Sequence, residues 1–206
     1  MSEAKSDILA KIHYALADRP ATAPIPRDYQ RTREVGDLLD LAQERIADYK
    51  ATVHRVALSG LVERITEVLT TRALRRLLAP VDLPDDWRIP GISWVVDEPS
   101  APLSVDTMAG SDGVLTGCAA AIAETGTIIL DAGPTQGRRA LTLLPDYHLC
   151  VIRAEQIVGT VPEAIARIGP ARPITFISGP SATSDIEFNR VEGVHGPRTL
   201  DVIITD

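Results

Sequence analysis

Residues 177–198 read ISGPSATSDIEFNRVEGVHGPR, and two apolar runs border them, Ile174–Ile177 and Leu200–Ile204. The stretch holds three glycines, which permit backbone angles that other residues avoid, and two prolines, which fix φ, so we expect a tight loop at each end. Between the loops, Ser184–Glu187 fits a capping box at a helix start. The order strand, loop, helix, loop, strand is typical of a parallel βαβ crossover.

The loop after the first of these strands is the expected position of a site, because ligands of open parallel sheets bind beyond the carboxyl ends of strands. Gly179, Ser181 and Thr183 offer hydrogen-bond donors there. Asp185 and Glu187 would repel a phosphate at the helix start, so we do not expect a simple phosphate cradle. The hydroxyl groups have an alternative role as caps or turn residues.

Composition limits the classes of function. The chain has 206 residues, of which 45% are hydrophobic, and this is enough for one domain with an appendage or for two small domains. A formal net charge of −7 argues against binding to nucleic acid or to an anionic membrane surface. The sequence shows neither an apolar run long enough to span a bilayer nor the apolar core of a signal peptide, so we expect a cytoplasmic protein.

The two cysteines, Cys118 and Cys150, lie in separate apolar segments and lack the CxxC spacing of metal sites. We therefore expect no iron–sulfur cluster or structural zinc held by this chain alone. A disulfide is not expected in the cytoplasm either, so the pattern predicts buried, inert thiols.

Residues 1–50 are predicted to form an N-terminal helical arm, with helices over Ser6–Ala17 and about 30–50 on either side of a Pro-rich linker.

The main domain is expected to cover residues 51–206. Its strands alternate with helices, which indicates an α/β fold with three layers and a mostly parallel sheet. The predicted strands are Thr52–Ala57, Ile92–Val96, Val114–Thr116, Thr127–Leu130, His148–Ile152 and the two runs named above. The predicted helices are Gly60–Leu78, whose Arg72, Arg75 and Arg76 are expected on a solvated face, Ser104–Ala109 and Val161–Ile168.

A second informative stretch, residues 113–131, combines small residues with one carboxylate and reads GVLTGCAAAIAETGTIILD. The small residues Cys118–Ala123 suit strands that pack closely or line a pocket. Glu124 follows them as a lone carboxylate in an apolar neighbourhood, flanked by Thr125 and Thr127. Such a group is usually solvated or paired, and it is also a candidate base or nucleophile.

Three segments together resemble the LutC/YkgG lactate-utilization family, whose members carry a LUD domain: Ala123–Thr127, residues 179–187 (GPSATSDIE) and residues 193–197 (GVHGP). Arg139, ahead of an apolar segment that ends in Leu-Pro, is a weaker fourth piece. The resemblance covers about residues 51–206, and it depends on the order and spacing of the segments.

The resemblance implies the fold shared by glucosamine-phosphate isomerases, ribose-phosphate isomerases and CoA transferases (the NagB/RpiA/CoA-transferase-like fold). It also implies a system that oxidises L-lactate to pyruvate, in which this kind of subunit works with two iron–sulfur proteins. The subunit carries no cluster motif of its own, so the clusters are expected in the partner proteins. The resemblance leaves open whether this chain catalyses a reaction by itself.

Two functions therefore stay open. In the first, the chain is a non-redox subunit that binds a small carboxylate, with Arg139 as its holder, or a partner subunit. In the second, the chain is a stand-alone enzyme of the acyl/CoA-transfer or sugar-phosphate-isomerase type, with Glu124 as the covalent nucleophile. The second rests on analogy of fold alone.

We expect one shared cleft that joins the turn at Glu124 to the loop at residues 179–187 and the loop at His195. The candidates for proton transfer are Glu124, Asp185 and His195. The candidates for ligand binding are Thr125, Thr127, Arg139, Gly179, Ser181, Thr183 and Glu187. A metal site at Asp185, Glu187 and His195 is not expected, because helix residues two apart point to different sides.

Overall fold

The computed structural model describes residues 3–18, 23–169, 172–183, 191–193 and 195–206. The chain forms two compact units, Met1–Gln30 and Arg31–Asp206. The larger unit begins before the boundary predicted at residue 51, because Ala42 and Ile46 are fully buried in its core.

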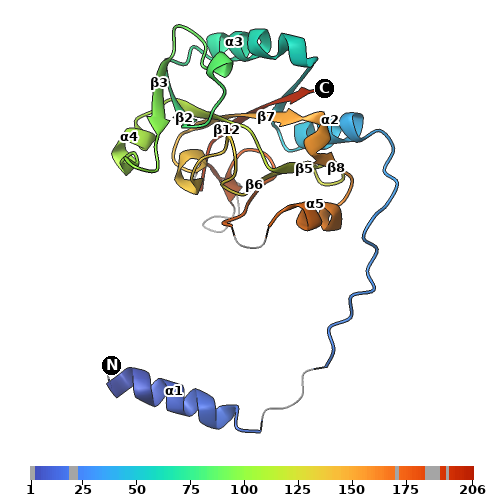
Figure 1. The fold of residues 1–206 in the computed structure, drawn as a ribbon, viewed down its shortest axis with the longest axis vertical. Helices are drawn as coiled ribbons and strands as arrows, with labels where there is room; N and C mark the ends of the chain where they lie inside the picture. Colours follow the sequence, from blue (N-terminus) through green and yellow to red (C-terminus); the bar gives the residue numbers. More distant parts are fainter. Residues whose placement is uncertain (1–2, 19–22, 170–171, 184–190, 194) are drawn as a thin grey trace. The chain divides into compact units, whose positions relative to one another are not determined.

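Six parallel strands build the central sheet of the larger unit, in the order β1-β12-β7-β4-β2-β3 (Figure 1). They are β1 (Thr52–Val56), β2 (Arg76–Pro80), β3 (Ser93–Asp97), β4 (Gly113–Thr116), β7 (Tyr147–Arg153) and β12 (Thr199–Thr205). The predicted α/β class with a mostly parallel sheet is confirmed. Strands β12 and β7 lie in the interior of the sheet and are almost entirely buried, which explains their apolar sequences.

A second sheet has four strands in the order β8-β5-β6-β9. They are β5 (Ala120–Ile122), β6 (Thr127–Leu130), β8 (Ile157–Val158) and β9 (Thr175–Ile177). Strand β6 pairs antiparallel with both β5 and β9, and β5 pairs parallel with β8. The small residues predicted to pack closely are those of β5 and its surroundings, and all but the half-buried Ala119 are buried.

The predicted βαβ crossover is wrong in its pairing. Both strands form, but β9 is the edge strand of the second sheet, whereas β12 lies between β1 and β7 in the first. The segment between them contains a two-stranded antiparallel ribbon, β10 (Ala182–Thr183) and β11 (Val191–Glu192). The helix start predicted at Ser184–Glu187 lies outside the described residues.

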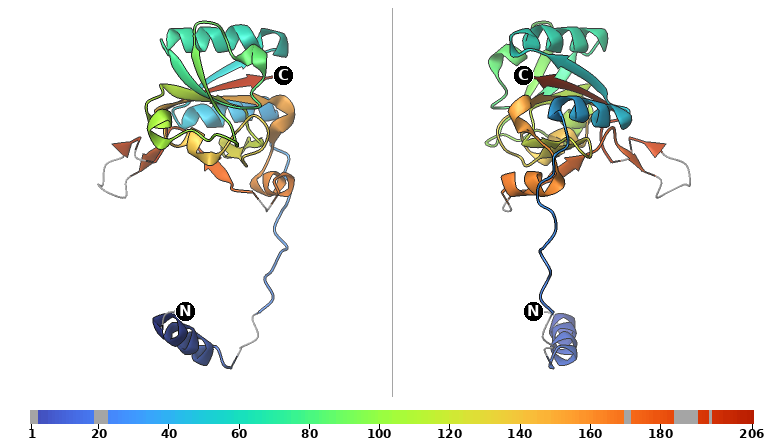
Figure 2. Two further views of the ribbon diagram at one scale, coloured as in Figure 1. Left: turned by 60° about the vertical axis from the view of Figure 1, so that its left-hand side comes forward. Right: turned by 90° about the vertical axis from the view of Figure 1, so that its right-hand side faces the viewer.

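Helix α3 (Leu61–Thr71) covers one face of the six-stranded sheet, and α2 (Leu38–Asp48) with the second sheet covers the other, which gives the three layers expected (Figure 2). Helix α3 packs on its face through four buried apolar side chains. The remaining helices of this unit are α4 (Val105–Ala109), which Ser104 caps as predicted, and α5 (Val161–Arg167), where Thr160 and Glu163 form a capping box. Short 3-10 turns cover Leu58–Gly60, Asp85–Trp87, Arg139–Thr142 and Ala154–Gln156.

Two predicted helices differ in length from the observed ones. Helix α2 begins at Leu38, because the Asp37 carboxylate accepts hydrogen bonds from the first turn. The helix predicted over Gly60–Leu78 ends at Thr71, and Ala73 adopts a left-handed φ of 54° that turns the chain into β2. Arg72 is exposed, as predicted, but its guanidinium also pairs with a buried aspartate of β12, which was not expected.

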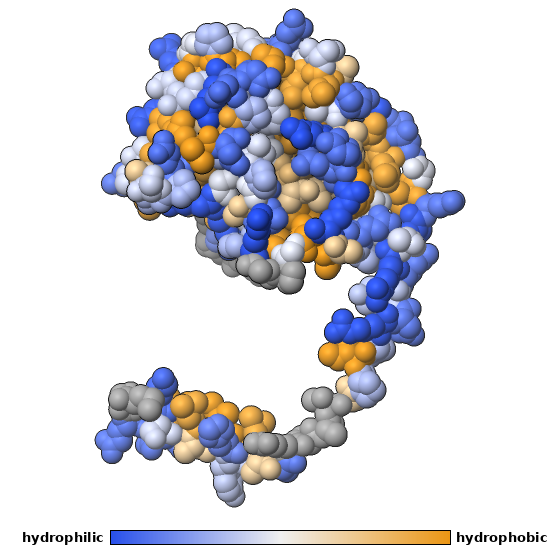
Figure 3. Space-filling model, viewed as in Figure 1, coloured by the Kyte–Doolittle hydropathy of each residue, from blue (hydrophilic) through white to orange (hydrophobic). Residues whose placement is uncertain are grey.

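The smaller unit contains helix α1 (Glu3–Ala15), which forms where a helix was predicted. All its residues are exposed, and its apolar side chains appear as orange patches in Figure 3. Its hydrophobic residues therefore stabilise no core within the described part of this unit.

Candidate functional site

A cleft of about 230 Å³ lies beside β9 and is enclosed by two loops. One loop follows β9 and the other precedes β12. Predicted residues Gly179, Ser181 and His195 all contribute to its walls. The other described lining residues are Thr142, Leu143, His148, Thr175, Phe176, Ile177, Ser178, Pro180, Ala182, Gly196, Pro197 and Leu200.

Ser181 ties the two loops together. Its N–H donates to the Pro197 carbonyl at 2.8 Å, and its carbonyl accepts from Gly193 N–H at 2.9 Å. Its side-chain oxygen accepts from the His195 N–H at 3.2 Å. The hydroxyl group predicted as a ligand contact therefore also holds the His195 loop in place.

Gly179 is required by the geometry of the same wall. Its φ is 84°, and a Cβ at this position would collide with the backbone carbonyl of Tyr49, which follows α2. A side chain here would push the loop away from α2. The glycine thus sets the distance between the cleft and the helix behind it.

Two histidines face the cleft in different environments. His195 is exposed at its surface, so its imidazole is accessible to a ligand. His148 is buried in β7, where its Nε2 lies 2.8 Å from Thr116 Oγ1, and burial lowers its pKa to about 4. His148 is therefore neutral near pH 7, and His195 is the imidazole that is exposed to a molecule in the cleft.

Glu124 does not belong to the described lining of this cleft. Its carboxylate pairs with the guanidinium of Arg33, and both side chains are partly exposed, at 34% and 53%. The backbone of Glu124 is held beside β8, because its N–H donates to the Gly159 carbonyl at 3.1 Å and continues the β5–β8 ladder. The predicted convergence of Glu124 with His195 in one cleft is thus not observed among the described residues.

Hydroxyl groups connect the Glu124 turn to the cleft instead. Thr125 Oγ1 donates to Thr127 Oγ1 at 2.8 Å, and Thr127 Oγ1 lies 2.9 Å from Ser178 Oγ. Ser178 lines the cleft. The two threonines therefore support the wall through Ser178, and neither belongs to the described lining of the cleft.

The remaining predicted residues lie elsewhere. Arg139 opens a 3-10 turn and lines a small hollow that shares Thr142 and Thr175 with the cleft. Thr183 belongs to β10, but its side chain lies outside the described residues, as do Asp185 and Glu187.

Within the described residues, no cluster of three His, Cys, Asp or Glu side chains could hold a metal ion. The helices of this same part are all too short or too polar to cross a membrane.

The family model of the LUD domain matches residues 105–205, which include both loops of the cleft. A protein named lactate utilization protein C from Deinococcus radiodurans is 45% identical over 98% of this chain and 96% of its own length. The chain belongs to the LUD-domain family. A lactate utilization protein C from Halalkalibacterium halodurans is 37% identical over 41% of the chain and 40% of its own length.

The LUD-domain fold is also supported by a solved structure. The crystal structure of a DUF162 family protein from Deinococcus radiodurans superposes with a TM-score of 0.70 and 43% identity. The match covers 82% of this chain and 96% of the solved one. The cleft therefore lies in a LUD domain whose architecture is shared with an experimentally determined relative.

In this LUD-domain protein, sequence reasoning missed His148 as a cleft residue. The signal was a single histidine inside an apolar strand, and its side-chain direction depends on the register of β7 between β4 and β12. That register is a tertiary property.

Replacing Glu124 with Gln is expected to lower the free energy of unfolding by less than about 1 kcal/mol, because partly exposed ion pairs contribute little. Urea unfolding at pH 7 measures the change. Arg33→Gln serves as the matched control and should cost a similar amount. A loss above about 2 kcal/mol in either variant would mean that the pair is a major structural contact.

Proposed function

We propose that this chain is the non-redox subunit of an iron–sulfur-dependent system that oxidises L-lactate to pyruvate. The observation that carries the proposal is 45% identity, over nearly the full chain, to a protein named lactate utilization protein C. The sequence has two cysteines, fewer than the four thiolates that commonly bind a cluster. The clusters are therefore assigned to two partner iron–sulfur proteins.

The cleft beside β9 is our candidate for binding the small carboxylate, lactate or pyruvate. Ser178, Ser181 and Thr142 supply hydroxyl groups, and His195 supplies an exposed imidazole. Arg139 lines the adjoining hollow and is our candidate to pair with a carboxylate. Hydrogen-bond donors on several sides are what a small polar acid requires.

Oxidation of lactate to pyruvate removes two electrons and two protons from the carbon that carries the hydroxyl group and from that hydroxyl group. His195 would accept the hydroxyl proton, the hydrogen on that carbon would leave as the second proton to solvent, and the two electrons would pass to the clusters of the partners. This chain contributes binding, orientation and proton transfer, and it contributes no redox group.

The alternative function, acyl transfer or isomerisation through Glu124, has less support. A nucleophile must reach its substrate, whereas Glu124 pairs with Arg33 and is absent from the described lining of the cleft. We therefore do not retain Glu124 as a catalytic residue.

Deletion of the gene in its host is expected to abolish growth on L-lactate and to leave growth on glucose unchanged. The wild-type gene should restore growth, and His195→Gln should fail to restore it while the protein stays folded and abundant. His13→Gln, which changes an exposed histidine of α1, is the matched control and should restore growth. Growth of the deletion strain on lactate would refute the pathway, and full rescue by His195→Gln would refute the role of the cleft.

A further inference from the structure

A second cavity, of about 380 Å³, lies at the carboxyl edge of the central sheet. Its base is formed where β4 and β7 end, by Gly117–Ala119 and by Val151 and Arg153. None of its described lining residues belongs to the cleft beside β9.

The topology favours a ligand at this edge. Strand β2 continues to β3, its neighbour on one side, whereas the adjacent β4 leads on to β7, its neighbour on the other side. Connections that leave adjacent parallel strands in opposite directions open a crevice beyond their carboxyl ends. Trp87, from the connection after β2, and Gly117, directly after β4, both line the cavity.

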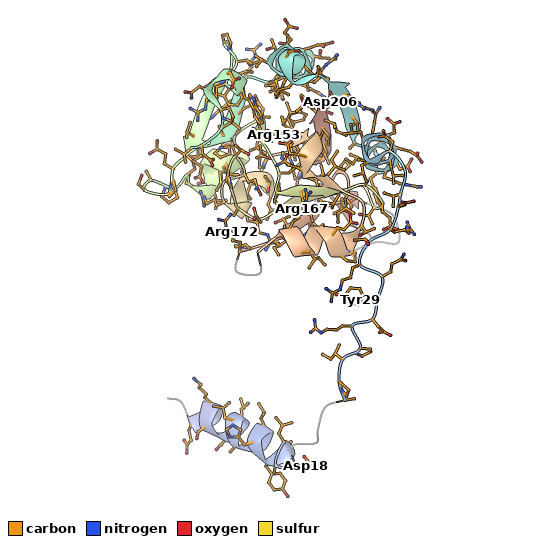
Figure 4. The ribbon with its side chains drawn as sticks, turned by 45° about the vertical axis from the view of Figure 1, so that its right-hand side comes forward. Asp18, Tyr29, Arg153, Arg167, Arg172 and Asp206 are labelled. Atoms are coloured by element: carbon orange, nitrogen blue, oxygen red, sulfur yellow. The ribbon has the colours of Figure 1, made fainter. Side chains whose placement is uncertain are left out.

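The cavity carries two arginines without a carboxylate partner. Arg153 ends β7 and Arg167 ends α5 (Figure 4). Neither forms an ion pair with an acidic side chain among the described residues. Nη1 of Arg167 donates to the Glu155 carbonyl at 2.7 Å, which fixes the side chain and leaves other N–H groups free to bind. Two such guanidinium groups are notable in a chain with a formal net charge of −7.

The one acidic residue in the described lining, Asp131, already has partners of its own. Its Oδ1 accepts from Gly133 N–H and from Gln136 Nε2, both at 3.0 Å, and its Oδ2 lies 3.7 Å from Arg172 Nη1. The described lining therefore carries two positively charged side chains and one negatively charged one.

The base of the cavity is uncharged and tightly built. A Cβ on Gly117 would collide with Thr135 Oγ1, so the backbone there approaches its neighbour as closely as possible. The contact with the Cys150 thiol and burial raise the pKa of the Cys118 thiol, which stays protonated. Trp87 and Val151 are buried and present apolar surface.

We propose that this cavity binds a small organic oxyanion, with its carboxylate or phosphate group held by Arg153 and Arg167 and its uncharged body against Trp87. Guanidinium groups match the planar and bidentate geometry of such oxyanions. The volume is in the lower part of the range typical for small-molecule sites. The site is separate from the cleft beside β9, so it does not depend on the proposed function.

Titration of the full chain with phosphoenolpyruvate, inorganic phosphate and pyruvate tests the proposal and separates phosphate from carboxylate recognition. Calorimetry should detect saturable binding of at least one of them, with a Kd on the order of 1 mM or tighter. Tryptophan fluorescence should change in parallel, and the change should disappear in Trp87→Phe but persist in Trp94→Phe. Glycerol, which is uncharged, should not bind.

The double variant Arg153→Gln/Arg167→Gln is expected to bind at least about tenfold more weakly, because two charge-assisted contacts are lost. Both side chains are exposed, so the thermal unfolding midpoint should change little. Arg64→Gln, a change of the same type on α3 outside the described lining, is the matched control and should bind as the wild type does. Unchanged binding in the double variant, or the absence of binding of all three anions to the wild type, would overturn the proposal.

Discussion

Asp201→Asn is expected to lower the free energy of unfolding by about 3 kcal/mol, because it removes a buried charge that two partners depend on. Asp201 lies in β12 and is 1% exposed. Its carboxylate accepts from Arg72 Nε at 3.0 Å and Nη2 at 2.8 Å, and from Tyr147 Oη at 2.9 Å. An amide in its place keeps one acceptor, loses the charge and turns an N–H₂ group toward donors.

Urea unfolding at pH 7 measures this loss. Asp40→Asn is the matched control, because its exposed pair with Arg55 should contribute less than about 1 kcal/mol. Tyr147→Phe removes one of the three hydrogen bonds and should cost about 1 kcal/mol. If Asp201→Asn cost no more than Asp40→Asn, the buried pair would not contribute to stability as we infer.

The same pair shows what local sequence patterns leave out. Arg72 was expected on a solvated face with Arg75 and Arg76 and is exposed, but the sequence did not predict its buried partner, an aspartate inside an apolar strand. The two residues are 129 positions apart, and only the packing of α3 on β12 brings them together. Long-range ion pairs of this kind cannot be read from periodicity.

The strands were predicted well where a short apolar run is enclosed by turn residues, as in β7 and β12. The end of α3 was predicted poorly, because Leu74 and Leu77 continue the helical spacing. The left-handed turn at Ala73 and the pairing of Leu77 with Trp94 decide the actual change to a strand. An apolar run of this length suits both structures, and tertiary pairing selects between them.

The sequence also did not predict to which of the two sheets a strand belongs. The run that becomes β9 was expected beside β12, yet it pairs with β6 through Ile128, Ile129 and Leu130. Alternation of apolar and polar side chains indicates a strand and its two faces, but it does not predict which strand lies beside it in the sheet.

Part of the candidate site could be predicted, since Gly179, Ser181 and His195 come from loops rich in Gly and Pro that meet at strand ends. Glu124 could not be placed, because its partner Arg33 comes from a segment assigned to the arm. The sequence identified the polar groups that are unusual, and the three-dimensional pairing decided which of them share a cleft.

The stability of the protein is expected to fall by about 2 kcal/mol more in the wild type than in His148→Gln when the pH is lowered from 7.5 to 5. Burial lowers the pKa of His148 to about 4 in the folded state, whereas an unfolded histidine has a pKa of about 6.5. Below pH 6.5 the unfolded chain therefore binds a proton that the folded chain does not, so the free energy of unfolding decreases as the pH falls and levels off below pH 4.

Urea unfolding of both proteins at several pH values in this window measures the difference. Gln retains a hydrogen-bonding group for Thr116 Oγ1 and does not titrate, so the variant isolates the contribution of the imidazole. Burial also lowers the pKa of His54, but His54 is present in both proteins and its effect cancels in the comparison. Parallel pH profiles for the two proteins would contradict the inference, because they would mean that His148 gains its proton in the folded state as readily as in the unfolded one.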